Sequence, residues 1–403
     1  MATLSAVVIG SGALGASVAY HLARRGAEVA LVEQHALGSQ TSPRAAGLTN
    51  TKAVSQPIMV RLQDEATETL ATFERDTGRS VGFVRSGSLK AAYTEAGERK
   101  LTKDVETARA RGIEVRAIAP SEAERLAPWF VVGASRALAH VPSDGYLDPA
   151  TLPIAYIQLA QQAGARIVPF TRVTDVLRAN GKVAGVATTL GDMRADVVVD
   201  AAGAWMVLVA ANAGITVPLV PVRHQLFITE PLTGVQPQHP VVRLIEASVY
   251  VRHERGGLMV GGYEDAPRVV DAAALPTGFQ MADLELDIGV LRSLVEEVAD
   301  HFPLLRDAPV AIHRGGLPTM TPDGMPILGA VHGADGFYVA SGCCVGGLSL
   351  SPAAGRALAD LILDGRSEPD LSPLSVERFR AFANDPAALT AAGVDHYARK
   401  YMK

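Results

Sequence analysis

A glycine motif at the start of the chain, Gly10-Ser-Gly-Ala-Leu-Gly15, constrains the fold more than any other feature. An apolar, β-branched run over 6–9 precedes it and predicts a buried strand, and a helix is expected over 16–25. A second apolar run over 29–32 ends in Glu33. Strand, tight turn, helix and strand in this order predict a parallel β-α-β unit.

Each part of this motif has a physical task. Gly10 permits the tight turn, Gly12 lets the backbone approach a pyrophosphate, and Gly15 lets helix and strand pack closely. The N-terminus of the helix offers N–H groups to the phosphates. Glu33 can accept hydrogen bonds from both ribose hydroxyls and disfavours a 2′-phosphate, which argues against NADP. The motif therefore predicts a dinucleotide site, but it does not distinguish NAD from FAD.

The composition excludes several classes of protein. Of the 403 residues 48% are apolar, which indicates a folded chain with a large core. The 37 basic and 42 acidic residues are interspersed, so neither nucleic acid nor an anionic membrane is an expected partner. Cys343 and Cys344 are adjacent, and no cysteine or histidine has metal-ligand spacing, so we expect no disulfide and no metal.

The N-terminus has neither the basic segment nor the cleavage site of a signal peptide, and the cysteine usage suits a reducing compartment. We therefore predict a cytoplasmic protein. The uncharged segment 201–222 is long enough to span a bilayer. Its glycines and prolines divide it into a turn, a short helix and a strand, so we predict a buried core segment and no transmembrane segment.

Hydrophobic periodicity predicts further helices over 56–78, 100–112, 150–163, 281–298 and 351–363. Strands are expected over 173–176, 184–188, 197–199 and 337–340, paired strands over 82–93, and an antiparallel sheet over 217–262. The predicted fold class is α/β (α+β), with a Rossmann β-α-β cofactor domain and an inserted substrate domain whose sheet is mixed and largely antiparallel. The cofactor domain is expected over 1–85, 143–216 and 315–385, the substrate domain over 86–142 and 217–314, and a C-terminal tail over 386–403.

A later segment helps to choose the dinucleotide. Val197-Val-Val-Asp-Ala-Ala-Gly203-Ala-Trp205 resembles the second signature of flavoproteins with two dinucleotide-binding domains. A plain buried strand followed by a turn has the same pattern, so this segment alone leaves both interpretations open.

Motifs along almost the whole chain resemble the FAD-dependent glycine, sarcosine and D-amino-acid oxidase (DAO) superfamily, nearest to its sarcosine and dimethylglycine dehydrogenase branch. Besides the glycine motif, they lie at 41–48, 144–149, 201–205, 223–231, 250–252, 256–264, 321–324 and 341–355. The resemblance implies a two-dinucleotide-binding-type FAD domain, with the flavin between it and the substrate domain. It also implies hydride loss from a carbon next to nitrogen, giving an imine that water hydrolyses. We expect no C-terminal folate-binding modules of the longer members, because the chain has 403 residues.

The resemblance assigns FAD binding to positions in the glycine turns, at the end of the second strand and in the loops that follow. They are Gly10, Gly12, Ala13, Leu14, Gly15, Glu33, Gln34, Arg44, Ala45, Ala46, Gly47, Leu48, Val173, Ala202, Gly203, Trp205, Gly316, Gly342, Val345, Gly346, Gly347 and Leu348.

Three departures from the family pattern concern the flavin. Arg44 stands where the branch commonly has a histidine that bonds covalently to the flavin, and Gly316 matches the cysteine that monomeric sarcosine oxidases use. We therefore expect FAD to be bound non-covalently. Met259 matches a lysine that promotes reaction with oxygen in oxidases. This slightly favours a dehydrogenase, and both O2 and another electron acceptor stay open.

The family's conserved stretch with a histidine is replaced by 342–347, which has none. The helix expected from Ser351 can still point its N-terminus at the N1–C2 carbonyl edge of the flavin, where its positive end would stabilise the anionic reduced form. Cys343 and Cys344 would then lie near the ring. They are either small buried side chains or have a redox or substrate-contact role.

The resemblance places His224 and Tyr250 on strand faces that line the pocket above the flavin, and alternation puts Arg252 on the same face as Tyr250. His224 could orient the amine or help to keep it neutral, and Tyr250 could hydrogen-bond the amine or a carboxylate. Arg252 could pair with a substrate carboxylate, with Lys52 and Arg314 as alternative partners. Structural roles for His224, Tyr250 and Arg252 are the competing interpretation.

The leading hypothesis is oxidation of the C–N bond of an amino acid, or of a secondary or tertiary amine, by hydride transfer to flavin N5. One alternative is the catalytic subunit of a heteromeric opine, proline or hydroxyproline dehydrogenase, which would bind a partner subunit. Oxidation of a 2-hydroxy acid on the same fold and a non-catalytic FAD-binding scaffold are the others.

Overall fold

The glycine motif forms the predicted β-α-β unit. The computed structural model describes residues 3–49, 56–382 and 384–402. Two parallel strands and the helix that connects them open the chain: β1 (Ser5–Ile9), α1 (Ala13–Ala23) and β2 (Glu28–Val32). Gly10 has a φ of +98°, a conformation that favours glycine, and a Cβ on Gly15 would overlap the carbonyl oxygen of Gly10. Both glycines are therefore required by the turn itself.

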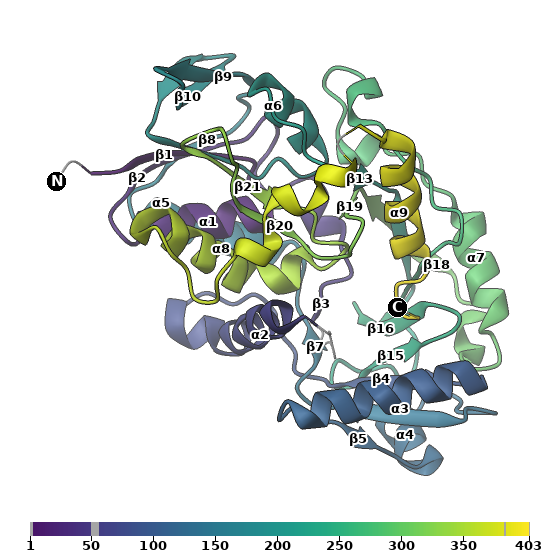
Figure 1. Cartoon of the computed structure of the whole chain (residues 1–403). Helices are drawn as coiled ribbons and strands as arrows, with labels where there is room; N and C mark the ends of the chain where they lie inside the picture. Colours follow the sequence, from purple (N-terminus) through teal and green to yellow (C-terminus); the bar gives the residue numbers. More distant parts are fainter. Residues whose placement is uncertain (1–2, 50–55, 383, 403) are drawn as a thin grey trace.

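This unit belongs to a six-stranded sheet whose strands come from separate stretches of the chain (Figure 1). β20 is antiparallel to β21, and the other neighbouring pairs are parallel. The strand order is β20 (Ile327–Ala330), β21 (Phe337–Ser341), β12 (Val197–Asp200), β1, β2 and β8 (Arg166–Val168). The carboxyl ends of β1 and β12 meet at one edge, where the N–H of Ala201 donates to the carbonyl of Ile9 at 2.9 Å.

Alternation along β1 sends successive side chains into two cores. Ala6 and Val8 face the first core, which four helices complete: α1, α2 (Pro57–Thr77), α5 (Thr151–Gln162) and α8 (Gly347–Asp364). Val7 and Ile9 face the second core. A small sheet and a short helix complete it: β9 (Val173–Ala179), β10 (Lys182–Thr188), β11 (Gly191–Arg194) and α6 (Met206–Asn212).

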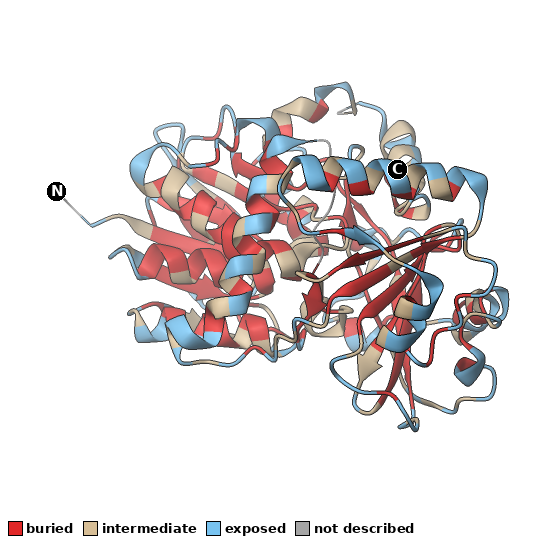
Figure 2. Cartoon of the chain, turned by 90° about the horizontal axis from the view of Figure 1, so that it is seen from below, coloured by how far each residue is buried: buried red, intermediate tan, exposed pale blue. Residues whose placement is uncertain are grey.

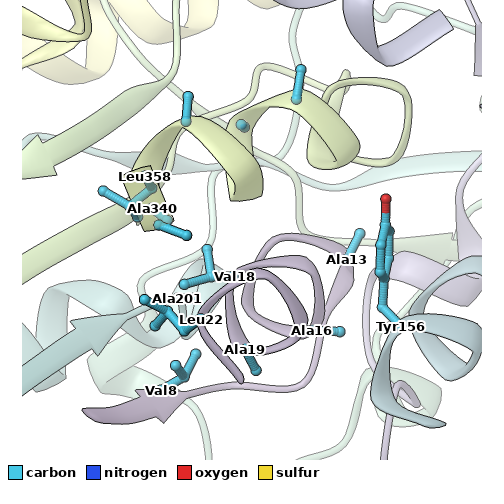
Figure 3. Close-up of a cluster of buried hydrophobic side chains, with 14 of the residues drawn as sticks. Val8, Ala13, Ala16, Val18, Ala19, Leu22, Tyr156, Ala201, Ala340 and Leu358 are labelled. Carbon is cyan, nitrogen blue, oxygen red and sulfur yellow. The ribbon is translucent and has the colours of Figure 1, made fainter. Parts of the chain in front are cut away.

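Small side chains let α1 and α8 lie close together in the first core (Figure 3). Ala16 and Ala19 of α1 are completely buried there. A Cβ on Gly355 of α8 would lie 2.7 Å from the Cβ of Ser17 and would overlap its hydroxyl. Gly355 therefore sets the distance between the two helices.

The second large sheet has eight strands and is antiparallel except for the β15–β4 pair. Its order is β18 (Val310–Gly316), β14 (His224–Thr229), β17 (Gly257–Gly262), β16 (Val249–Glu254), β15 (Val241–Leu244), β4 (Ser88–Ala92), β6 (Ala137–Val141) and β5 (Arg116–Ala117). One face packs against α7 (Ile288–Glu297), and the opposite face carries Leu226, Tyr250 and Met259. Figure 2 shows buried residues concentrated in the sheets and exposed residues on the outer helices.

Shorter elements connect the two sheets and cover their edges. They are α3 (Glu95–Ala110), α4 (Pro120–Leu126), the pair β3 (Leu48–Thr49) and β7 (Gly145–Tyr146), the pair β13 (Val220–Pro221) and β19 (Thr319–Met320), and α9 (Pro386–Ala398). The segment predicted as a tail thus contains a helix, and α9 lies against β13 and β19 (Figure 1).

Two predicted elements differ from the observed ones. The region 82–93 contains one strand, β4, which pairs with β6 and β15, while Val84 forms only an isolated bridge to Tyr146. The helix predicted over 281–298 is a 3-10 turn at Met281–Asp283 followed by α7. Asp287 ends the intervening loop, because its side chain accepts from the N–H of Gly289 and caps α7.

The strands of the six-stranded sheet lie within 5–32, 166–200 and 327–341, and those of the eight-stranded sheet within 88–141 and 224–316. The expected boundary between 314 and 315 falls inside β18, and the domain limits stay a prediction. Among the described residues, no helix is both long enough and apolar enough to cross a membrane.

We expect Gly355→Ala to destabilise the protein by about 1–3 kcal/mol, because the added methyl group overpacks the crossing of α1 and α8. At an exposed position inside a helix, replacing glycine by alanine stabilises a protein by up to about 1 kcal/mol. The sign of the change in unfolding free energy therefore distinguishes the two cases. Urea unfolding measures the difference. Ser17→Ala/Gly355→Ala is the matched control and should recover part of the loss, since the overlapping hydroxyl is gone. A single variant more stable than the parent would contradict this packing.

Candidate active site

A cavity of about 990 Å³ is lined by residues of both large sheets and of the loops between them. The glycine turn, the loop 41–48 and the turn 340–349 supply one part of its wall. β14, β15, β16 and the last residues of the chain supply another part. Such a volume lies at the upper end of the range for small-molecule sites, so the cavity can hold a ligand larger than an amino acid.

Two long helices begin at this cavity, and each has a glycine at its N-cap: Gly12 for α1 and Gly346 for α8. Neither glycine has a side chain that could cap its helix, although Ser42 Oγ accepts from the N–H of Ala13 at 3.1 Å. First-turn N–H groups and the positive ends of both helix dipoles therefore favour an anionic or electron-rich group in the cavity.

The carboxylate of Glu33 is held in a fixed orientation at the end of β2. One oxygen accepts from the N–H and the hydroxyl of Ser11, both at 2.9 Å, and the other accepts from the N–H of His35 at 2.9 Å. Trp205 lies beside His35, with ring centroids 6.1 Å apart. Glu33 is thus oriented next to the glycine turn, where the sequence predicts the ribose.

Most of the predicted cofactor positions line the cavity: Gly12, Ala13, Leu14, Arg44, Ala45, Ala46, Gly47, Leu48, Gly203, Gly316, Gly342, Val345, Gly346, Gly347 and Leu348. The others lie outside its lining, at the glycine turn or near Glu33: Gly10, Gly15, Glu33, Gln34, Val173, Ala202 and Trp205. Their contacts with FAD stay a prediction.

Arg44 lines the cavity, and its guanidinium donates to the carbonyl oxygens of Ser39 and Gln40. Burial, followed by the nearby charge of Arg314, lowers the pKa of Arg44. Gly316 lies against Thr41, whose Cγ2 would be 3.0 Å from an added Cβ. Neither position therefore carries an imidazole or a thiol that could bond to a flavin.

His224 is the centre of a buried aromatic cluster. Its Nδ1 lies 2.7 Å from the hydroxyl of Tyr397 and its Nε2 lies 2.9 Å from the hydroxyl of Tyr250. Its ring stacks on Tyr263 with centroids 5.1 Å apart. Burial, assisted by the charge of Lys400, lowers the pKa of His224 to about 4, so the imidazole is neutral at neutral pH.

Tyr250 reaches His224 because Gly261 stands opposite it on β17. A Cβ on Gly261 would lie 2.8 Å from Cε2 of Tyr250 and would overlap the hydroxyl, so only glycine lets the ring lie across the sheet in this way. Burial raises the pKa of Tyr250, which keeps the hydroxyl protonated. His224 and Tyr250 both line the cavity, and their hydrogen bond joins two of the predicted catalytic residues.

Arg252 does not line the cavity. Its guanidinium donates to the carbonyl of Ala46 at 2.8 and 2.9 Å, pairs with Glu254 at 2.6 Å and lies over the ring of Tyr146. Arg314 also pairs with Glu254 at 2.9 Å and donates to the carbonyl of Ala45. Both arginines therefore fix the loop that carries Ala45 and Ala46. The third carboxylate candidate, Lys52, lies outside the described residues.

Several cavity residues were not predicted. Tyr397 contacts His224 from α9, and Lys400 and Tyr401 of the following turn line the cavity. Arg243 and Lys90 line it from β15 and β4. A signal for Arg243 does exist, because it is the only charged residue in an apolar strand, Val-Val-Arg-Leu. Nothing in the sequence around Tyr397 reveals its contact with His224, which lies 173 positions away.

A mainly parallel sheet with a glycine turn, a second, mainly antiparallel sheet and a large cavity lined by residues of both are the architecture of a dinucleotide-binding protein with a second, ligand-binding layer. The family described as FAD dependent oxidoreductase (DAO) matches residues 5–361. The chain belongs to this family.

Two relatives and one solved structure show how similar the chain is to known proteins. The chain is 30% identical over 99% of its length to human mitochondrial sarcosine dehydrogenase. It is 31% identical over 98% of its length to 4-methylaminobutanoate oxidase (formaldehyde-forming) of Paenarthrobacter nicotinovorans. It spans 44% and 48% of these relatives, less than half of each. The crystal structure of L-proline dehydrogenase from P. horikoshii superposes with a TM-score of 0.84 at 26% identity, covering 94% of this chain and 98% of that one.

We expect His224→Gln to reduce the loss of stability in acid. The pKa of His224 is lowered in the folded state, from an ordinary value of about 6.5 to about 4, so unfolding takes up a proton at this residue once the pH falls below about 6.5. Between pH 7.5 and 5 this linkage removes roughly 2 kcal/mol of stability from the parent protein.

Urea unfolding of both proteins at pH 7.5 and pH 5 measures this difference. His21, whose pKa burial lowers to about 3, is present in both proteins, and its contribution cancels in the comparison. An equal loss of stability in parent and variant would show that His224 does not resist protonation in the folded protein.

Proposed function

We propose that this chain oxidises the C–N bond of an amino acid whose nitrogen is secondary or tertiary, with non-covalently bound FAD. The observation that carries the proposal is the hydrogen-bonded pair of His224 and Tyr250 at the cavity of a DAO-family chain. Sarcosine, 4-methylaminobutanoate and L-proline, the compounds in the names of its relatives, all combine a secondary amine with a carboxylate. These names support the substrate class without identifying the substrate.

The residues present fit FAD. In this proposal the uncapped first turns of α1 and α8 bind the pyrophosphate and the flavin edge, respectively, and Glu33 accepts from the ribose hydroxyls. The chemistry that FAD supplies when bound is acceptance of a hydride from the carbon next to the nitrogen, and water then hydrolyses the imine product. Arg44 and Gly316 offer no group for a covalent bond.

The chain's own residues prepare the amine. Hydride loss needs the lone pair of the nitrogen, so the amine must be neutral when it reacts. Burial in the cavity favours the neutral amine, and the neutral imidazole of His224 leaves the positive charge of an imidazolium out of the site. Tyr250 presents the hydroxyl that His224 orients, and this hydroxyl is the group that we assign to substrate contact.

The electron acceptor and partners are part of the same proposal. Met259, at the position of the oxidase lysine, is completely buried on β17 and has no charge that could promote reaction with oxygen. We therefore infer that another acceptor takes the electrons, in the cytoplasm, where Cys343 and Cys344 stay reduced. A partner subunit would be the acceptor if purified chain reduces its flavin with substrate but turns over only with that subunit.

We expect N-substituted amino acids to bleach the flavin under anaerobic conditions. A panel of sarcosine, dimethylglycine, 4-methylaminobutanoate, L-proline and hydroxyproline is compared with lactate and glycolate by absorbance near 450 nm. Slow return of the colour on admission of oxygen indicates a dehydrogenase. Bleaching by the hydroxy acids alone would contradict C–N oxidation, and bleaching by neither group would favour a non-catalytic FAD-binding protein.

Acid precipitation tests the mode of FAD binding. We expect the yellow colour in the supernatant, because Arg44 and Gly316 provide neither a histidine nor a cysteine for a covalent link. The absorbance of both fractions measures the distribution, and Cys343→Ser is a control for an unexpected link through the partly exposed thiol at the cavity. Colour that stays in the pellet of the parent protein would overturn non-covalent binding.

A further inference from the structure

Three cavity-lining side chains form one row across the eight-stranded sheet. In the strand register, Lys90 of β4 is opposite Arg243 of β15, which is opposite Tyr250 of β16. Residues opposite one another on neighbouring strands point to the same face. All three side chains line the cavity. The row therefore places two basic side chains on the face of the sheet that carries Tyr250.

Arg243 is buried, with 2% of its surface exposed, and its guanidinium is only partly paired. Its Nη1 lies 3.5 Å from a carboxylate oxygen of Asp144. Within the part of the chain that the structure describes, Nε and Nη2 of Arg243 have no hydrogen bond of normal geometry, although the hydroxyl of Tyr401 is close enough to Arg243 that the guanidinium opposes the rise in pKa that burial gives this hydroxyl. These two nitrogens form one edge of the guanidinium, the edge that binds a carboxylate with two parallel hydrogen bonds.

A buried hydrogen-bond donor without a full set of partners destabilises the folded protein, and a charged donor does so more strongly. The cavity is the side from which a ligand can reach Arg243, because the residue is otherwise enclosed in the sheet. Apart from the nearby hydroxyl of Tyr401, the described residues place no acceptor at this edge, so an acceptor bound in the cavity would satisfy it.

Lys90 adds the charge that selects an anion. Asp144 pairs with Arg243, and Asp104 pairs with Lys100 at 3.1 Å. No hydrogen bond or ion pair within the described ranges involves the ammonium of Lys90, and burial lowers its pKa. Two ion pairs thus cancel locally, and an anion bound between Lys90 and the open edge of Arg243 would oppose the effect of burial and favour the charged form of Lys90. A single carboxylate matches both features.

The other arginines near the cavity are not available in this way. Arg252 and Arg314 share Glu254 and are held by the carbonyls of Ala46 and Ala45. Arg44 is held by backbone carbonyls of its own loop. Arg314 also has one buried nitrogen without a partner, Nε, and Arg44 donates through Nη1, but of these four arginines Arg243 is the one whose Nε and Nη2 are both buried and without a hydrogen-bond partner among the described residues.

We propose that Arg243 and Lys90 bind one carboxylate of the substrate, so that the site selects amino acids and rejects the corresponding esters and simple amines. That the bound carboxylate belongs to a substrate rests on the proposed function, whereas the anion site itself does not depend on it. Arg243 and Tyr250 are opposite one another on neighbouring strands and both side chains line the cavity, so a carboxylate held by Arg243 lies on the face of the sheet that carries Tyr250.

The first experiment needs no turnover. Holoenzyme is titrated with acetate and with methylamine, and the change in flavin absorbance gives a Kd for each. We expect Arg243→Gln to weaken acetate binding about 10- to 100-fold, since a bidentate charge-assisted contact is lost. Lys90→Met should weaken it several-fold, and Arg243→Lys should restore part of the loss. Lys182→Met removes an exposed lysine of β10 and should leave the Kd unchanged.

A second experiment uses the reaction. For a bleaching amino acid and its methyl ester, the parent should prefer the acid, and Arg243→Gln should lose that preference mainly through a higher KM with kcat less affected. FAD content and urea unfolding show whether each variant is folded. If Arg243→Gln does not fold, Lys90→Met, at a partly exposed position, tests the site in its place.

The two proposals fail separately. If acetate binding depends on Arg243 but no amine bleaches the flavin, the anion site stands and the proposed reaction falls. If amines bleach the flavin and neither acetate binding nor the preference for the acid responds to Arg243→Gln and Lys90→Met, the anion site is wrong and the proposed reaction stands.

Discussion

The close contact between α1 and α8 determines where the ends of both helices lie, and the rest of the cavity depends on it. Gly355 against Ser17 fixes the distance between the helices, and each helix begins at a glycine on the same cavity. Two positive helix ends therefore converge on one volume. A residue larger than glycine at position 355 would push the two helices apart and move one helix end away from the other.

The turn that leads into α8 stores strain to reach this position. Gly342, Cys344 and Val345 have φ values of +68°, +45° and +67°, and the left-handed region is unfavourable for a β-branched residue such as Val345. Cys344 is held in place, because its N–H donates to the carbonyl of Thr319 at 3.1 Å and its sulfur accepts from the N–H of Thr321 at 3.4 Å. The buried thiol of Cys344 thus helps to hold the turn at the edge of the cavity.

The sequence was most informative where structure is local. The glycine turn, Glu33 and the apolar strands each depend on residues within about twenty positions, so pattern alone predicts them. Arg252 shows the limit, since alternation places it on the cavity-side face but cannot show that the carbonyl of Ala46, 206 positions away, takes its guanidinium. The same limit applies to α9, whose contact with His224 depends on how the end of the chain packs. The prediction of paired strands over 82–93 is wrong for the same reason, because the strands that pair with β4 lie far along the chain.

The hydrogen bonds around His224 link three elements at the cavity. Nδ1 lies 2.7 Å from the hydroxyl of Tyr397 on α9, and Nε2 lies 2.9 Å from the hydroxyl of Tyr250 on β16. The imidazole is neutral, so one ring nitrogen donates and the other accepts. In the tautomer whose Nδ1 accepts from Tyr397, Nε2 donates to the oxygen of Tyr250 and the proton of Tyr250 is available to a ligand; in the other tautomer, Tyr397 donates to the carbonyl of Arg223 at 3.5 Å.

Donors that face a cavity select acceptors. A hydroxyl donating to an amine nitrogen would occupy the lone pair that hydride loss requires, whereas a carboxylate can accept from it without that cost. The row from Tyr250 to Arg243 and Lys90 offers a hydroxyl and two basic groups to the cavity. Through Tyr397 and His224, the last helix of the chain is hydrogen-bonded to the tyrosine at one end of this row.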